Sequence, residues 1–309
     1  MSAAASTVAQ IPELSGHIVD FLETSPPDLT ADKTLFSQSL LFRDIHLDEA
    51  PTGSSAMKLA RMLESISSPQ QFELISLIRC VQMPIHRDTL MALAEANITL
   101  FAVRDLIFTG VKGTCPIKLA QHLVAGMPAL RKLTLANALR DFVDLVDLLC
   151  CLPPTIESLA FRFLFLHRPT PSGIFEGTQL RIKSLDLFYA SPVEDWLLSP
   201  SSPCDLSQME AFGAIQWTDS ISKIFHTSQT IMRLKMPGAL IFDHVDAPHL
   251  ARLTSLEISS SSNWHFEYVT RVIAKIPAEN VLQFLTLEIP EEAIPVSGFV
   301  ELDQAIDQV

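Results

Sequence analysis

The sequence predicts an α/β fold made of one repeated strand-and-helix unit, and three observations support this. First, a hexamer with apolar residues at its first, fourth and sixth places recurs nine times, starting at residues 78, 103, 130, 156, 182, 206, 231, 253 and 282. Second, neighbouring copies start 22 to 29 residues apart. Third, the segments between copies carry apolar residues three and four positions apart. An L-x-x-L-x-L core with a period in the mid-twenties is the signature of the leucine-rich repeat.

Each hexamer predicts a short strand, because its apolar residues alternate in the way that buries one side of a strand. The clearest copy is LRKLTLAN at 130–137, with Leu130, Leu133 and Leu135. The helical spacing between copies predicts helices over 117–124, 142–149, 221–225 and 266–273. Since every crossover repeats the one before it, we expect parallel strands on the concave side of a solenoid and helices on its convex side.

Some features depart from a regular repeat. The proline-containing stretches HRPTPSG (167–173) and SPSSPCD (199–205) predict loops, although the period continues across both of them. The ninth place usually holds Asn or Cys, whose side chains hydrogen-bond the backbone from coil to coil. Here the ninth place holds Ala138, Leu164, Ala190, Ala214 and Ala239. We therefore expect an irregular leucine-rich-repeat solenoid.

The chain divides into four predicted segments. Residues 1–10 are small and polar and are expected to be disordered. Residues 11–47 are predicted to form a helical N-terminal head, which would shield the first repeat. The solenoid is predicted over 48–297, and 298–309 are expected to form an acidic closing helix.

Composition excludes several classes of function. The net charge of −13 argues against nucleic-acid binding, which needs clustered Lys and Arg, and against a polybasic membrane-surface protein. No apolar run reaches 18 residues, and the start MSAAASTVAQ lacks the pattern of a signal peptide. The five cysteines form no C-x-x-C pair, which favours reduced thiols. We expect a cytoplasmic or nuclear protein that binds neither nucleic acid nor membrane.

The head begins with IPELSGHIVDFLE (11–23), a predicted amphipathic helix, and ends with LFRDIHL (41–47). With these two segments and its irregular repeats, the chain resembles the F-box-like leucine-rich-repeat proteins abundant in mushroom-forming fungi. In that family the F-box docks on the Skp adaptor of a cullin-based ubiquitin ligase, and the repeats hold a protein substrate. The resemblance implies an adaptor-facing set made of Ile11, Pro12, Leu14, Ile18 and Leu22.

The head departs from the family at one place. The family's leucine-valine-cysteine-arginine-x-tryptophan helix is missing between Leu29 and Leu35. The head is therefore too short by about two or three helical turns. Either the box is degenerate or the gene model omits a segment, and adaptor binding depends on which alternative holds.

No motif for catalysis or cofactor binding is present. The chain has no G-x-S-x-G elbow, P-loop or G-x-G-x-x-G, and ten glycines leave little room for a phosphate-binding loop. Asp243, His244, Asp246 and His249 could suggest a metal site, but a turn with surface histidines explains them better. We expect no cofactor, no metal and no enzymatic activity.

Places three, five and seven of each repeat are predicted to point to the concave side. There, Phe188 and Phe212 are expected to be neighbours beside Arg162, with an acidic pair that meets two cations. Arginine and aromatic residues dominate interface energetics. The predicted partner-binding set is Arg162, Asp186, Phe188, Glu210, Phe212, Arg233 and Lys235. The alternative is that loops cover the phenylalanines and that the charges pair with one another.

The sequence thus predicts a non-catalytic substrate receptor of an SCF-type ubiquitin ligase, with the head on the Skp adaptor and the repeats on an unknown protein substrate. The alternative is a leucine-rich-repeat interaction scaffold that has lost adaptor binding. A third possibility, an enzyme with a site on the rim of the solenoid, has no motif in its favour.

Overall fold

The computed structural model describes residues 43–47, 57, 59–61, 72, 75–95, 99–110, 116–164, 166, 173–259 and 266–288. The chain divides into two compact units. Unit 1 comprises Met1–Ile156 and Leu164–Ser172, and unit 2 comprises Glu157–Phe163 and Gly173–Val309. The predicted tail 1–10, the predicted closing helix 298–309 and all five predicted adaptor-facing residues (Ile11, Pro12, Leu14, Ile18 and Leu22) lie outside the described residues.

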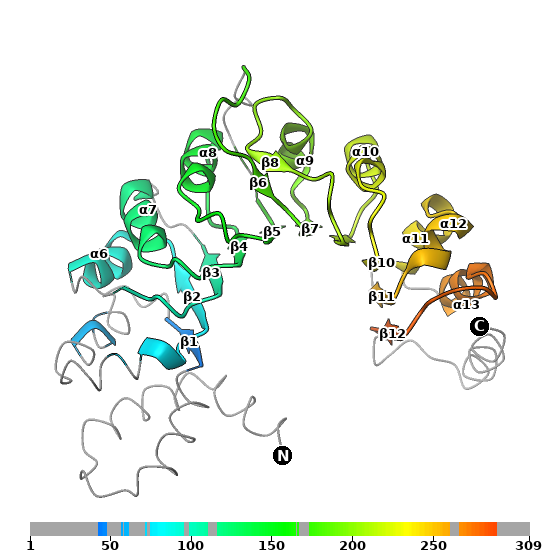
Figure 1. The fold of residues 1–309 in the computed structure, drawn as a ribbon, viewed down its shortest axis with the longest axis horizontal. Coiled ribbons are helices and arrows are strands. Elements are labelled where there is room, and N and C mark those ends of the chain that lie inside the picture. The colour runs from blue at the N-terminus through cyan, green and yellow to red at the C-terminus, as the bar shows by residue number, and fades with distance from the viewer. Residues whose placement is uncertain are drawn as a thin grey trace, which may run out of the picture. The chain divides into compact units, whose positions relative to one another are not determined.

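Unit 1 alternates strands and helices. Its elements are β1 (Asp44–His46), β2 (Cys80–Pro84), α6 (Arg87–Glu95), β3 (Asp105–Thr109), α7 (Ile117–Ala125), β4 (Lys132–Ala136) and α8 (Phe142–Cys150). The strands pair in chain order and all pairs are parallel, so that Val81, Leu106 and Leu133 lie side by side. Helices α7 and α8 lie on the same side of β3 and β4 (Figure 1).

Unit 2 continues the same pattern. Its elements are β5 (Ser158–Arg162), β6 (Leu180–Arg181), β7 (Ser184–Phe188), α9 (Ser191–Leu197), β8 (Cys204–Asp205), β9 (Ala211–Ala214), α10 (Asp219–Thr227), β10 (Arg233–Pro237), α11 (Gly238–His244), α12 (Ala247–Arg252), β11 (Ser255–Ser259), α13 (Phe266–Lys275) and β12 (Phe284–Leu287). Strands β5, β7, β9, β10, β11 and β12 form a parallel sheet in this order, with the helices on one side of it (Figure 1).

The apolar places of the hexamer form the core. Leu130, Leu133 and Leu135 are fully buried, as are Leu185 and Ile182 in unit 2. Burial of one such side chain stabilises the fold by roughly 1.5–3 kcal/mol, so each repeat depends on the apolar contacts with its own helix and with its neighbours. The predicted leucine-rich-repeat architecture of parallel strands and flanking helices is confirmed. We call the sheet face opposite the described helices, which carries places three, five and seven, the non-helical face.

The last residues of the predicted helical head form a strand instead. Asp44–His46 are β1, which pairs in parallel with β2 and extends the sheet of unit 1. The backbone amides of Arg79 and Cys80 both donate to the carbonyl of Arg43, at 2.9 and 3.0 Å. Residues 44–46 therefore form a strand along the edge of β2, and the sheet of unit 1 begins before residue 48.

The copy that starts at residue 206 has a different register from the one the sequence predicts. Phe212 pairs with Leu185 and Leu234, which occupy place four of their repeats, so the true first place is Met209. Two hydroxyl contacts also support Met209 as the first place. The Thr155 hydroxyl donates to Leu130 O at 2.7 Å, and the Thr230 hydroxyl donates to Met209 O at 2.9 Å. Each threonine thus bonds the first place of the preceding repeat.

The last two residues of the predicted loop over 199–205 form strand β8. This strand pairs in parallel with β6 as a separate two-stranded sheet. Most of the other proline-containing stretch, 167–172, lies outside the described residues. At the ninth place, Ala138, Leu164 and Ala190 are fully buried and contribute apolar contacts only. Among the described residues, no helix combines the length and the apolar character needed to cross a membrane.

Candidate functional site

The residue that follows the strand has a left-handed backbone in four repeats. The φ angles are 40° at Gly110, 51° at Asn137, 52° at Phe163 and 53° at Tyr189. Glycine and asparagine are the residues that commonly adopt this conformation, whereas a bulky aromatic residue with positive φ is a genuine outlier. The left-handed conformation costs an ordinary L-residue roughly 1–2 kcal/mol. Phe163 and Tyr189 therefore carry backbone strain that the same position avoids in unit 1.

Two of these residues extend the hydrogen-bond ladder of the sheet. The amide of Phe163 donates to the carbonyl of Phe188 at 2.7 Å, and the amide of Gly110 donates to the carbonyl of Ala136 at 3.0 Å. Phe163 and Gly110 thus each add one hydrogen bond beyond the end of their strand.

At positions 163 and 189 the side chains point outward and meet. The rings of Phe163 and Tyr189 stack, with centroids 5.3 Å apart and planes inclined by 25°. They remain 51% and 50% exposed, respectively. A stacked pair contributes about 0.5–1.5 kcal/mol beyond its buried area, which offsets part of the strain. Half of each ring is still free to contact a partner.

Arg162 and Phe188 lie directly beside this pair. They are register partners on β5 and β7, and the Arg162 guanidinium carbon lies 5.4 Å from the centroid of the Phe188 ring. Arg162 is exposed and Phe188 is half-buried. We call Arg162, Phe163, Phe188 and Tyr189 the aromatic cluster. All four residues belong to unit 2 and lie where β5 and β7 end.

Asp186 lies two residues before Phe188 on the same face and turns away from Arg162. A Cβ atom added to Gly213 on β9 would overlap the Asp186 Oδ1. The carboxylate therefore extends across Gly213, on the side of β7 opposite to β5. The missing side chain at Gly213 makes room for it. Among the described residues, no cation pairs with Asp186.

Further along the non-helical face, Lys235 holds two carboxylates. Its Nζ donates to Glu257 and also to Glu288, the latter at 3.2 Å. Burial acts to lower the pKa of Lys235, but the hydrogen bonds to the two carboxylates and their attraction outweigh it, so the pKa is raised. The predicted neighbourhood of Lys235 and Glu257 is therefore present, and this part of the face is internally paired.

The structure places the seven predicted partner-binding residues in different environments. Arg162 and Phe188 are neighbours on the non-helical face, as predicted, and Arg233 is exposed on β10. Phe212 was predicted to lie beside Phe188, and this is wrong. Its side chain is only 2% exposed and packs on Phe225 of α10, with ring centroids 5.9 Å apart.

Glu210 was predicted to pair with Asp186, and the same change of register makes this wrong. Gly213, and not Glu210, lies opposite Asp186. Glu210 precedes β9, where its carbonyl accepts hydrogen bonds from the amides of Met232 and Arg233. The acidic pair predicted from the hexamer alignment is therefore absent from these described strands.

Sequence reasoning missed Phe163 and Tyr189, because it stopped at the seventh place of each repeat. A signal was available at the eighth place, which holds Gly110 and Asn137 in the preceding repeats. Glycine and asparagine in consecutive repeats indicate a left-handed backbone. The aromatic residues that follow at the same place are then exceptional and mark a candidate site.

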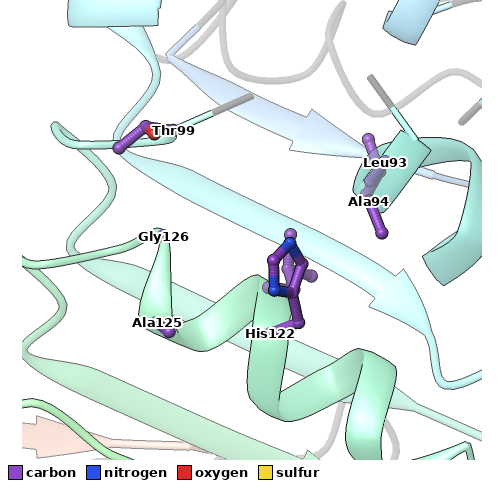
Figure 2. Close-up of a pocket in the computed structure, with 7 residues that line it drawn as sticks. Leu93, Ala94, Thr99, His122, Ala125 and Gly126 are labelled. Carbon is purple, nitrogen blue, oxygen red and sulfur yellow. The ribbon is translucent and has the colours of Figure 1, made fainter. Parts of the chain in front are cut away.

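Two other places in the described chain could suggest a site. A pocket of about 210 Å³ lies between α6 and α7, and among the described residues that line it His122 alone is titratable. Figure 2 shows the ring of His122 projecting from α7 toward Leu93 and Ala94 of α6. A single exposed histidine among apolar residues has no partner for acid–base work, so this pocket does not suggest chemistry.

In the histidine-rich connection, Asp246 and His249 form the cap of a helix. Asp246 caps α12 by accepting a hydrogen bond from the His249 amide at 3.0 Å, and it also accepts one from the His249 ring. Burial acts to raise the pKa of Asp246, but these two hydrogen bonds outweigh it and lower the pKa. His244 instead stacks on Trp217, with centroids 4.8 Å apart. In the described ranges, no group of three metal-binding side chains occurs.

Two solved structures resemble this chain at low identity. No protein-family model matches the chain, and no curated protein matches it. The leucine-rich repeat-containing protein LegL7 from Legionella pneumophila is similar in structure, with 14% identity, a TM-score of 0.47, and coverage of 85% of this chain and 96% of LegL7. A protein from Bacteroides fragilis is similar with 10% identity, a TM-score of 0.42, and coverage of 81% and 85%. Identities this low concern the fold alone.

Proposed function

We propose that this protein is a non-catalytic, leucine-rich-repeat module that binds a protein partner through the aromatic cluster of unit 2. The observation that carries this proposal is the strained and exposed pair of Phe163 and Tyr189. Residues in sparsely populated backbone conformations collect at functional sites, where the strain is retained for a purpose other than stability.

The composition of the cluster also fits a protein interface. Aromatic residues and arginine are enriched at the energetically dominant positions of interfaces, and they pack around a desolvated centre. Arg162 and Phe188 hold each other in place before a partner arrives, as do the two stacked rings. Preorganised side chains lose less conformational entropy on binding, which increases affinity.

The experiment compares partners captured by the wild-type chain with those captured by Phe163→Gly and Tyr189→Gly. These variants remove the rings but keep a residue suited to the left-handed backbone, so the fold is expected to remain. Proteins identified by quantitative mass spectrometry should be lost from both variants and retained by Asn137→Gly in unit 1. Equal capture by all four proteins would refute the aromatic cluster as the binding surface.

We further propose that residues 11–47 attach this module to the Skp adaptor of a cullin ubiquitin ligase in the cytoplasm or nucleus, which would make it a substrate receptor. The resemblance of the head to an F-box supports this role. Among the described residues, Cys80, Cys150 and Cys151 are not in disulfides, which is consistent with a reducing compartment. The alternative is an interaction scaffold without an adaptor, which the short head favours.

The two alternatives separate in one reconstitution. Purified protein is mixed with the Skp adaptor and passed over a size-exclusion column, with Leu14→Asp and Ile18→Asp as controls. A receptor gives a co-eluting complex that both substitutions abolish. A wild-type chain that elutes alone would support the scaffold, and re-examining the genomic sequence around Ala31 and Asp32 would show whether a segment of the head was omitted.

A further inference from the structure

From the geometry of Arg162 we infer that the aromatic cluster binds an extended peptide segment in which a carboxylate side chain lies next to an aromatic one. This inference rests on the proposed function, since it names the chemistry of the partner at the same surface. It depends on three features of the cluster: an arginine with free donors, an aspartate that turns away from it, and two exposed ring faces.

The guanidinium of Arg162 is held by a ring and not by an acid. The Phe188 ring lies 5.4 Å from its guanidinium carbon, and in the part of the chain that the structure describes no carboxylate pairs with it. Contact with a ring leaves the N–H donors of a guanidinium available at its edge. Those donors match the two oxygens of a carboxylate, in hydrogen bonds about twice as strong as neutral ones.

Asp186 would be the obvious partner of Arg162, and its position is therefore informative. It lies opposite Ala160, diagonally across the strand pair from Arg162, within reach of long side chains. Its carboxylate nevertheless extends over Gly213, away from β5. In a chain with a net charge of −13, the arginine beside the exposed rings thus keeps its charge available for an acid from outside.

The stacked pair supplies the apolar half of the site. Phe163 and Tyr189 expose about half of each ring next to Arg162, and aromatic rings associate edge-to-face or offset with a further ring. Residue 162 and residue 163 are consecutive, so the guanidinium and the rings lie within a few residues' reach of an extended chain. A partner segment can therefore satisfy both with neighbouring side chains.

The test uses a library of random linear peptides displayed on phage and selected against the full-length protein. The expected result is enrichment of peptides with Asp or Glu within two or so residues of Phe, Tyr or Trp. A selected peptide is then synthesised with a fluorophore, both as the acid and with Asn or Gln in place of the acid. Replacing the acid should weaken binding by about tenfold or more, because charge-assisted hydrogen bonds are lost.

Two variants localise the effect. Arg162→Gln should lower the affinity for the acidic peptide by about the same factor. The acid and amide forms of the peptide should then bind this variant with similar affinity. Arg181→Gln is the matched control, since Arg181 is also exposed in unit 2 but lies on β6, outside the aromatic cluster, and it should leave affinity unchanged at physiological ionic strength. Circular dichroism of each variant establishes that the fold is retained.

The outcomes distinguish the two levels of the proposal. Some peptides could require Phe163 and Tyr189 but bind equally well as the acid and as the amide. That result would refute the inferred carboxylate contact and leave the proposed function standing. Enrichment of basic peptides whose binding depends on Asp186 would also overturn the inference of an acidic partner. Selected peptides that bind Phe163→Gly and Tyr189→Gly as tightly as wild type would refute both the inference and the proposed surface.

Discussion

In both units the residue after a strand has a left-handed backbone, but different residue types occupy this position. In unit 1 the strands β3 and β4 are followed by Gly110 and Asn137, and in unit 2 the strands β5 and β7 are followed by Phe163 and Tyr189. All four residues have positive φ between 40° and 53°. In each unit one of these residues also extends the ladder, because the amides of Gly110 and Phe163 both donate to the neighbouring strand.

Stability therefore does not explain why Phe163 and Tyr189 follow the strands of unit 2. Glycine or asparagine would meet the backbone demand at little cost, as in unit 1, whereas each aromatic residue costs roughly 1–2 kcal/mol before the gain from stacking. Strain that a simple substitution would relieve marks a position with another role. The predictions below, from the largest expected effect to the smallest, test this contrast.

The comparison requires that Phe212 belongs to the core and Phe188 to the surface of unit 2. We expect Phe212→Ala to lower the free energy of unfolding by about 3–5 kcal/mol, because the ring is 2% exposed and packs on Phe225. Phe188→Ala removes a half-buried ring and its contact with Arg162, so the loss should stay below about 2 kcal/mol. Urea denaturation followed by circular dichroism measures both. Similar losses would mean that the register of β9 is wrong.

The strain itself can be measured by comparing glycine with alanine at the same position. At 163 and at 189, the glycine variant should be more stable than the alanine variant by about 1 kcal/mol, although both lose the stacked ring. In unit 1, Asn137→Gly should change stability by no more than about 0.5 kcal/mol. Chemical denaturation of all five variants provides the measurement. Alanine variants as stable as the glycine variants would show that positions 163 and 189 are not strained.

Most of the fold could be predicted from the hexamer, because burial of places one, four and six leaves a direct trace in the sequence. The register of one copy could not. Around β9, the frame Leu206, Met209, Ala211 and the frame Met209, Phe212, Ala214 both satisfy the apolar pattern. The choice depends on contacts across repeats, including the bond from Thr230 to Met209 O, which no pattern within a single repeat contains.

The candidate site was predicted in part for a similar reason. Alternation places Arg162 and Phe188 on one face, and parallel pairing makes them neighbours. Phe163 and Tyr189 lie beyond the alternation, where a left-handed residue redirects the side chain. A period-two pattern says nothing about a residue that leaves the strand conformation, so the positions of Phe163 and Tyr189 became visible only in three dimensions.

The charged residues of the non-helical face allow a second contrast between the units. In unit 2 Lys235 bonds two carboxylates, whereas in unit 1 no described carboxylate forms an ion pair with Lys132. We expect Lys235→Ala to lower the free energy of unfolding by up to about 1 kcal/mol, and Lys132→Ala by less.

The effect of Lys235 should depend on salt and pH. Because the pKa of Lys235 is raised in the folded protein, its contribution is complete below the pKa of the unfolded chain and is lost as pH rises through the folded value. The difference between wild type and Lys235→Ala should therefore shrink above pH 10 or so and in high salt. Urea titrations over pH and salt measure it. A difference that is constant across both series would show that the ion pairs contribute nothing.

The smallest effect concerns Cys80, on the non-helical face of unit 1. Burial, and after it the charges of Asp44 and Asp105 on the adjacent strands, raise the pKa of this thiol to about 11, although Lys132 acts in the opposite direction. The thiolate is the reactive form, so alkylation by iodoacetamide should be slow at pH 8 and should rise about tenfold per pH unit up to the pKa. Asp44→Asn together with Asp105→Asn should accelerate alkylation only several-fold, because burial is the larger cause. Mass spectrometry of the Cys80 peptide measures the rate of alkylation. A rate that levels off below pH 9 would show that neither burial nor the two acids controls this thiol.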